Sequence, residues 1–375
     1  MIKNLKWFNK VHQAKNLRIS LLLVLTMLVS PAFSQKSKSD SKQQKPKTDE
    51  QRISLFDSDE PLELTLRFDI TGYLKKSLKS ASFDGDMTIY FNNTDSVNKK
   101  VTIKYRGISR YQNCNFPPIQ INFKKPLLSN SDSGKIKKLK LVTHCEPGSQ
   151  SDEYVLREYL VYKLFNALTD TSFRVRLLKV NYIDTKRSRK PIRQYGFFIE
   201  PIEQLAERTN SFVVKTTSLT QKDIVPIVMD RLTIFNYMIS NWDWSMAGQH
   251  NVAVIKPANN SFGGLGIVIP YDFDLTGVVN AEYAVPPPAL GIQNIRERLF
   301  FGICRDKEVF QEDLKILLNK KDKLYSVINE FTWLNPRAKK DITNFLDQFF
   351  NQLEKQKSLD NLINLFINSC KKSQH

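Results

Sequence analysis

Apolar and polar residues alternate over several short stretches in the first half of the chain. These stretches lie at 62–70, 86–91, 100–107, 118–125 and 138–143, with turn-forming residues between them. Because successive side chains of a strand point to opposite faces, the alternation predicts an antiparallel sheet. Two further strands are predicted at 174–184 and 194–201, and a basic turn joins them.

A longer period marks the predicted helices. Apolar residues recur at helical spacing over 151–168, where Ser151 or Asp152 can cap the start. The later predicted elements are a helix at 222–241, a strand pair at 251–257 and 265–274, and helices at 312–321, 322–331, 341–356 and 359–370. Strands followed by helices indicate an α+β protein, with a sheet-rich N-terminal lobe at 53–215 and a helix-rich C-terminal lobe at 216–375.

The first 52 residues follow neither pattern. Residues 1–34 combine a basic start, an apolar run too short to span a bilayer easily, and the small residues Ala32 and Ser34. They predict a secretory signal peptide that is cleaved after Ser34, with an uncleaved anchor as the alternative. Residues 35–52 have almost nothing apolar to bury and predict a disordered polar linker. We therefore expect an exported protein, periplasmic or extracellular, without an integral membrane span after cleavage.

The chain is strongly basic, with a formal net charge of +18. Such a surplus favours anionic partners, whether nucleic acid, an acidic envelope component or a phosphate ligand. The Lys and Arg residues are spread along the sequence, and there is no zinc-finger spacing or RNA-binding aromatic motif. Specific nucleic-acid binding is therefore not predicted.

Four cysteines are present, an even number that favours disulfides in an exported protein. Cys114 and Cys145 lie at the ends of predicted strands and form the preferred pair, while Cys304 and Cys370 either pair or stay free. A zinc site formed by Cys114, His144 and Cys145 is the alternative. Adjacent His and Cys side chains do not easily reach one ion, and the sequence has no C-x-x-C.

Four oxygen-bearing side chains lie at the edges of strongly apolar runs: Asp243, Asn251, Asp272 and Asp274. A hairpin of the two strands at 251–257 and 265–274 would bring Asn251 close to Asp272. Carboxylates and an amide are the ligands that Mg²⁺ needs beside a nucleotide's phosphates, and phosphoryl transfer adds a base near the acceptor. Turn-forming residues and a structural calcium site are the alternatives. The sequence has no G-x-S-x-G, H-E-x-x-H or P-loop motif, which excludes the commonest hydrolase and NTPase signatures.

The segments "SNWDWSMAGQHN" and "IPYDFDLTG" resemble the catalytic and metal segments of the CotH-type spore-coat kinases, an atypical protein-kinase family. Upstream, "VTIKYRGISR" resembles the family's R-x-R-G-x-S strand, with Lys104 in place of the first Arg. The similarity runs loosely over residues 101–277. It implies a bilobal protein-kinase-like fold, ATP with Mg²⁺ or Mn²⁺, and phosphorylation of Ser or Thr in an envelope or secreted protein. A larger set of motifs is similar to a group of uncharacterised exported bacterial proteins and implies no activity.

By this resemblance Asp243 would be the catalytic Asp, Asn251 and Asp272 would bind the metal, and Asp274 would be a second ligand or a support. The implied nucleotide-binding residues are Arg157, Glu158 as the acidic partner of a lysine, and Lys104 or Lys140 as that lysine. The sequence departs from the family in three places: the interval from Asp243 to Asn251 is longer, no Arg-His follows Asp243, and the usual lysine is missing.

Two other functions use the same residues. One is a non-catalytic, pseudokinase-like envelope protein that binds an acidic partner. The other is a metal-dependent hydrolase or transferase that acts on a different phosphate ester.

Overall fold

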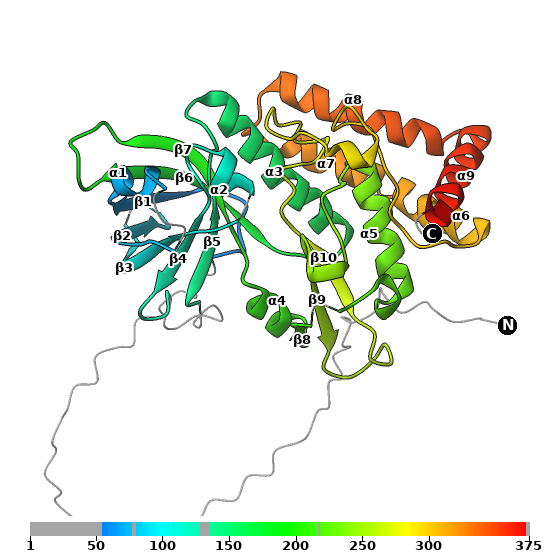
Figure 1. The fold of residues 1–375 in the computed structure, drawn as a ribbon, viewed down its shortest axis with the longest axis horizontal. Coiled ribbons are helices and arrows are strands. Elements are labelled where there is room, and N and C mark those ends of the chain that lie inside the picture. The colour runs from blue at the N-terminus through cyan, green and yellow to red at the C-terminus, as the bar shows by residue number, and fades with distance from the viewer. Residues whose placement is uncertain are drawn as a thin grey trace, which may run out of the picture. The chain divides into compact units, whose positions relative to one another are not determined.

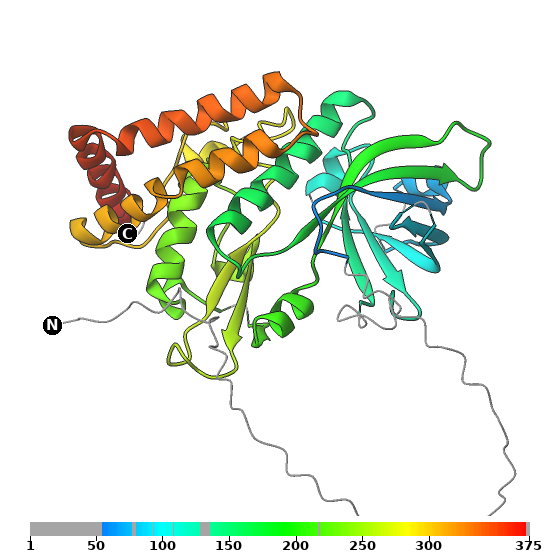
Figure 2. The same cartoon turned by 180° about the vertical axis from the view of Figure 1, so that it is seen from behind.

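The computed structural model describes residues 55–372, except 77–79, 93, 108, 128–135 and 217. The predicted signal peptide and linker lie outside these residues. The described chain belongs to one compact unit. Figure 1 shows a barrel at one side of it and a group of helices at the other, and Figure 2 shows the same arrangement from behind.

Seven strands close into the barrel, in the order β1-β2-β3-β4-β5-β7-β6. Their bounds are β1 (Leu62–Phe68), β2 (Ser82–Tyr90), β3 (Ser96–Tyr105), β4 (Ile119–Phe123), β5 (Lys138–Val142), β6 (Val175–Asp184) and β7 (Ile192–Ile199). All neighbours are antiparallel except β1 and β6, which pair in parallel from Leu62 opposite Leu178 to Phe68 opposite Asp184. Closure leaves this sheet without an unpaired edge.

The expected bilobal protein-kinase-like fold is wrong, because a closed seven-stranded barrel does not fit it. The individual strands were predicted well, since alternation along a strand reports which of its faces is buried. Alternation says nothing about which strand lies next to which. The parallel β1–β6 pairing joins segments more than 100 residues apart, and no local pattern contained it. The mixture of sheet and helix remains that of an α+β chain.

Two hydrophobic cores share the strands β6 and β7. Leu178 and Val180 of β6 pack inside the barrel, whereas Val175 and Leu177 pack against the helical part. Both strands are therefore buried on both faces at this end, which fastens the barrel to the rest of the unit. The long helix α3 (Ser149–Leu168) packs on β7 and contributes Leu160 and other buried residues to the second core.

The other described elements include eight α-helices and a second sheet. They are α1 (Ile70–Leu74), α2 (Ser109–Asn113), α4 (Ile202–Arg208), α5 (Pro226–Met238), α6 (Lys307–Leu318), α7 (Lys321–Glu330), α8 (Pro336–Leu353) and α9 (Gln356–Lys372), with a second sheet of β8 (Ser211–Val214), β9 (Val252–Pro257) and β10 (Ile267–Pro270). This sheet has the order β10-β9-β8 and is antiparallel. Helix α8 begins sharply, because Asn335 caps it and Pro336 occupies its first position. None of the helices in the described residues is long and apolar enough to cross a bilayer.

The preferred disulfide is confirmed, since Cys114 is bonded to Cys145, and Cys304 is bonded to Cys370 as well. Both sulfurs of the first pair are used, so the alternative zinc site with His144 is excluded. The four cysteines of the chain are thus all oxidised.

His144 is fully buried beside the first disulfide. Its ring stacks on Phe116 at a centroid distance of 4.4 Å, and neither ring nitrogen has a hydrogen-bond partner among the described residues. Burial, helped by the nearby charge of Arg110, lowers the pKa of His144 to about 3. The folded protein therefore holds a neutral imidazole at a pH where the unfolded chain binds a proton.

We expect this imidazole to make folding sensitive to mild acid. As the pH falls from about 6.5 towards 3, the unfolded state gains a proton that the folded state cannot accept, so stability is lost in that window. Between pH 7 and 5 the loss from this residue is about 2 kcal/mol. We expect urea unfolding at pH 7 and pH 5 to show that the free energy of unfolding falls less in His144→Leu than in the wild-type protein. The difference between the two losses should be about 2 kcal/mol. An equal loss in the variant would contradict the assignment.

Candidate functional site

Asp243 lies in the loop after α5 and is tied to the start of β9. Its Oδ1 is 2.7 Å from Nε2 of His250, and Asn251 donates from Nδ2 to its Oδ2 at 2.9 Å and to its backbone carbonyl at 2.7 Å. The loop therefore closes on itself, and it places the carboxylate of Asp243 next to the amide of Asn251.

The hairpin of β9 and β10 places Asn251 opposite Tyr271, the residue before Asp272. The backbone N–H of Tyr271 donates to the carbonyl of Asn251 at 3.0 Å. Asn251 and Asp272 both have a left-handed backbone, with φ of 52° and 63°. Asn and Asp adopt this conformation more readily than most residues, yet it still costs energy, and such strain concentrates at functional sites. The N–H of Asp272 is also held by the hydroxyl of Tyr162 on α3, at 2.8 Å.

Two arginines from the connection after β3 face the carboxylates. Arg106 lies 4.0 Å from Asp272, while Arg110 lies 3.7 Å from Glu158 of α3 and 3.9 Å from Asp274. These distances are longer than a charge-assisted hydrogen bond, which is about 2.7–2.9 Å. Oε1 of Glu158 is buried and has no hydrogen-bond partner among the described residues. The arginines thus lie near the carboxylates, but they do not form close hydrogen-bonded ion pairs with them.

Burial and mutual repulsion disfavour the charged forms of these acids. Burial, followed by repulsion from Asp272, raises the pKa of Asp274 to about 7, although Arg110 opposes the change. Burial and the charge of Asp274 likewise raise the pKa of Glu158 well above its usual value. A positive charge that entered the cluster would reverse both shifts.

Lys140 lies on the outer face of β5, near the same carboxylates. Its ammonium is 4.7 Å above the ring of Tyr271. The side chain of Lys140 is exposed, and its ammonium is repelled by Arg106 and attracted by Asp272. Lys104, the other predicted lysine, is also exposed. It lies on β3 opposite Gln120 of β4, and Gln120 lies opposite Lys140 of β5. Two strand spacings separate them by roughly 10 Å.

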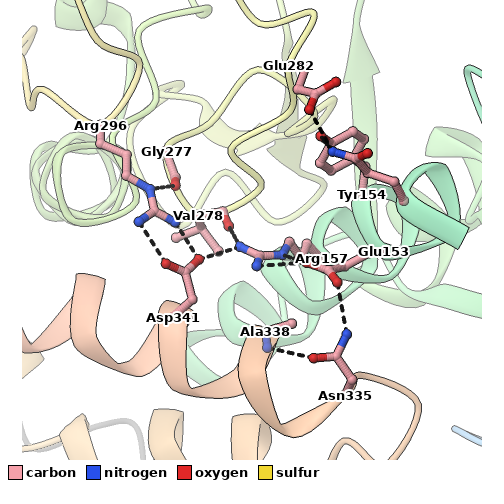
Figure 3. Close-up of polar contacts among 11 residues, drawn as sticks. Glu153, Tyr154, Arg157, Gly277, Val278, Glu282, Arg296, Asn335, Ala338 and Asp341 are labelled. Carbon is pink, nitrogen blue, oxygen red and sulfur yellow. Dashed lines mark hydrogen bonds and ion pairs between the residues drawn. The ribbon is translucent and has the colours of Figure 1, made fainter.

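Arg157 belongs to a different set of contacts, which Figure 3 shows. Its guanidinium bonds Glu153, the carbonyl of Val278 and, at 2.7 Å, Asp341 of α8. Arg296 reaches the other oxygen of Asp341 at 2.9 Å (Figure 3). Arg157 is held by Val278 and Asp341, whereas Glu158 lies beside Arg110, so the two residues belong to different sets of contacts. We place only Glu158 in the candidate site.

The predicted residues that the structure brings together are Asp243, Asn251, Asp272, Asp274, Glu158 and Lys140. Sequence reasoning missed Arg106, Arg110, Tyr162 and His250 as members of the site. A signal existed for two of them, because Arg106 and Arg110 both occur in the "RGISR" motif.

Hard oxygen donors make the site chemically suited to Mg²⁺ or Mn²⁺. Within the described residues, no three His, Cys, Asp or Glu side chains are grouped so that they could hold a metal ion. Mg²⁺ commonly uses only one or two carboxylates, with phosphate oxygens and water as its other ligands. Asn251 and Asp272 fit that description.

Two surface hollows lie elsewhere. One, of about 310 Å³, is lined by Arg67, Asp86, Lys100 and neighbours on the outer face of the barrel, and the other, of about 580 Å³, by Asp59, Lys163, Arg174 and neighbours. Neither is lined by the residues of the candidate site.

Comparison of the sequence with models of known protein families and with curated proteins finds no match.

We expect Asp341→Asn to destabilise the protein without acting on the candidate site. Hydrogen bonds from Arg296 and Arg157 outweigh burial and lower the pKa of Asp341. The substitution leaves Arg296 without its anion, while Arg157 keeps only Glu153. Because the side chain of Asp341 is 35% exposed, the cost should be about 2 kcal/mol, less than for a fully buried pair. Urea unfolding should show it, whereas Asp322→Asn, an exposed Asp on α7, should change stability by under about 1 kcal/mol. Equal losses in the two variants would contradict a role for Asp341 in holding the two arginines.

Proposed function

We propose that the acidic site binds a divalent cation together with a phosphorylated ligand, with ATP as the first candidate, and transfers a phosphoryl group to a Ser or Thr hydroxyl of an exported protein. Asn251 and Asp272 would hold Mg²⁺ or Mn²⁺, with Asp274 and Glu158 behind them. The cation would neutralise charge on the phosphate oxygens. Lys140 and Arg106 would face the remaining phosphate charge.

One observation carries this proposal: carboxylates are concentrated around arginines that do not fully pair with them. Asp272, Asp274 and Glu158 each have a guanidinium nitrogen only at 3.7–4.0 Å. Placing anions together in a buried setting is costly unless a cation compensates them. A bound divalent ion would supply that compensation, and hard oxygen ligands select such an ion.

Asp243 is suited to act on the acceptor hydroxyl. Its carboxylate accepts hydrogen bonds from His250 and Asn251, which orient it, and its side chain is 22% exposed. A hydroxyl within hydrogen-bond reach could give its proton to this carboxylate while the oxygen attacks phosphorus. His250 is 56% exposed and holds the carboxylate of Asp243 in place from the solvent side.

Two further observations support the choice of substrate and compartment. The oxidised state of both cysteine pairs is typical of exported proteins. The motif similarity to CotH-type kinases favours ATP and a hydroxyl acceptor. That support rests on the motifs alone, since the closed barrel is not a kinase-like fold.

A non-catalytic protein that binds an acidic partner is the second candidate. It is favoured by the lack, in the described part of the chain, of three His, Cys, Asp or Glu side chains grouped for a metal. In that case Arg106, Arg110 and Lys140 would be the binding groups, and added metal would have no effect.

Thermal unfolding tests binding of the cation and the phosphate. A ligand that binds only the folded state raises the midpoint, so Mn²⁺ with ATP should raise it by several degrees. Asp272→Asn removes one proposed ligand and should abolish the shift, while the exposed Asp322→Asn should keep it. No shift in the wild-type protein, or the same shift in Asp272→Asn, would reject the cation site.

Phosphoryl transfer tests the role of Asp243. We expect Asp243→Asn to lower the rate of transfer from ATP to a Ser/Thr peptide mixture by about 100-fold or more, the usual loss for a general base. Its Kd for Mn²⁺ with ATP should stay within about threefold of wild type, because Asp243 does not hold the ligand. Wild-type transfer in the variant would remove Asp243 from the mechanism.

A further inference from the structure

The segment 114–118, which connects α2 to β4, is covalently bonded to the chain between β5 and α3. Cys114 is bonded to Cys145, and the N–H of Phe116 donates to the carbonyl of Cys145 at 3.0 Å. Both cysteines are buried. The disulfide therefore fixes α2 against the end of β5.

Arg110 lies one helical turn before Cys114. Its carbonyl accepts from the N–H of Cys114 at 2.9 Å, so its backbone is tied directly to the bridged residue. Its guanidinium donates to the carbonyl of Thr143, two residues before Cys145. The disulfide and the guanidinium thus connect the same two stretches of chain, one through sulfur and one through a hydrogen bond.

From this anchored position Arg110 reaches two other elements. It lies 3.7 Å from Glu158 on α3 and 3.9 Å from Asp274 after β10, and its side chain is only 9% exposed. Nε of Arg110 has no hydrogen-bond partner among the described residues. The guanidinium is therefore held by its hydrogen bond to the carbonyl of Thr143 and by the charges of the two carboxylates, and not all of its N–H groups are hydrogen-bonded.

We propose that the Cys114–Cys145 disulfide is a positioning element of the cation–phosphate site, acting through Arg110 to hold Glu158 and Asp274 side by side. This inference rests on the proposed function, because it concerns the readiness of that site to bind. Glu158 and Asp274 come from different elements, and the guanidinium of Arg110 lies within 4.0 Å of both, so it offsets the repulsion between their charged forms. Without the disulfide, α2 is no longer held against the end of β5. Arg110 then moves away from Glu158 and Asp274, and the two carboxylates separate before a ligand binds.

The second disulfide gives a matched control. Cys304 and Cys370 also join distant parts of the chain, with a buried Cys370, but they lie outside every contact of the candidate site described above. A general effect of losing a disulfide appears in both double variants, whereas a positioning effect appears only in Cys114→Ala with Cys145→Ala.

The experiment is titration of the purified protein with Mn²⁺ in the presence of ATP, by calorimetry and by the rise in thermal midpoint. We expect the Cys114/Cys145 variant to bind at least tenfold more weakly than wild type, and the Cys304/Cys370 variant to stay within about threefold. Arg110→Gln should show the same loss as the first double variant. Arg110→Lys keeps the charge and should recover part of the affinity.

The outcomes distinguish failure of the positioning role from failure of the proposed function. Wild-type affinity in a folded Cys114/Cys145 variant, or in Arg110→Gln, overturns the positioning role and leaves the proposed function intact. A wild-type protein that does not respond to Mn²⁺ with ATP overturns the proposed function and this inference with it. If the Cys114/Cys145 variant does not fold, the comparison of Arg110→Gln with Arg110→Lys decides.

Discussion

The guanidinium of Arg110 is the interaction on which the candidate site depends. It is buried, and it lies between carboxylates from two separate elements, Glu158 of α3 and Asp274 after β10. Without a positive charge, these acids would repel each other in surroundings that also disfavour their charged forms. One side chain, itself anchored beside a disulfide, therefore links the barrel, the central helix and the second sheet.

This arrangement is suited to binding more than to packing. Structural ion pairs elsewhere in the chain are close: Arg305 bonds both oxygens of Asp230 at 2.9 Å, and Arg157 meets Asp341 at 2.7 Å. The contacts of Arg106 and Arg110 with their acids are about one ångström longer. The charges of this cluster are therefore paired less closely than those of the structural ion pairs.

Much of this could be predicted from the sequence, for identifiable reasons. Alternation located the barrel strands, helical spacing located α3, and the predicted hairpin placed Asn251 opposite the residue before Asp272. Closure of the barrel could not be predicted, since the β1–β6 pairing is a contact between distant segments. Short elements such as α2 were missed because a five-residue helix carries too little periodicity. The role of Arg110 could not be predicted for a different reason: its partners are 48 and 164 residues away in the sequence. The sequence did indicate that Arg157 and Glu158 leave the helix in different directions, because consecutive helix residues point about 100° apart.

The most direct test is to locate the cation. Crystals of the protein grown with Mn²⁺ and a non-hydrolysable ATP analogue would show the metal by its anomalous scattering. We expect one strong peak within about 2.5 Å of the carboxylate of Asp272 and the amide oxygen of Asn251, bridged to phosphate oxygens. A peak at other acids, such as Asp84 and Asp86 on the barrel, or no peak beside Asp272 and Asn251, would contradict the account.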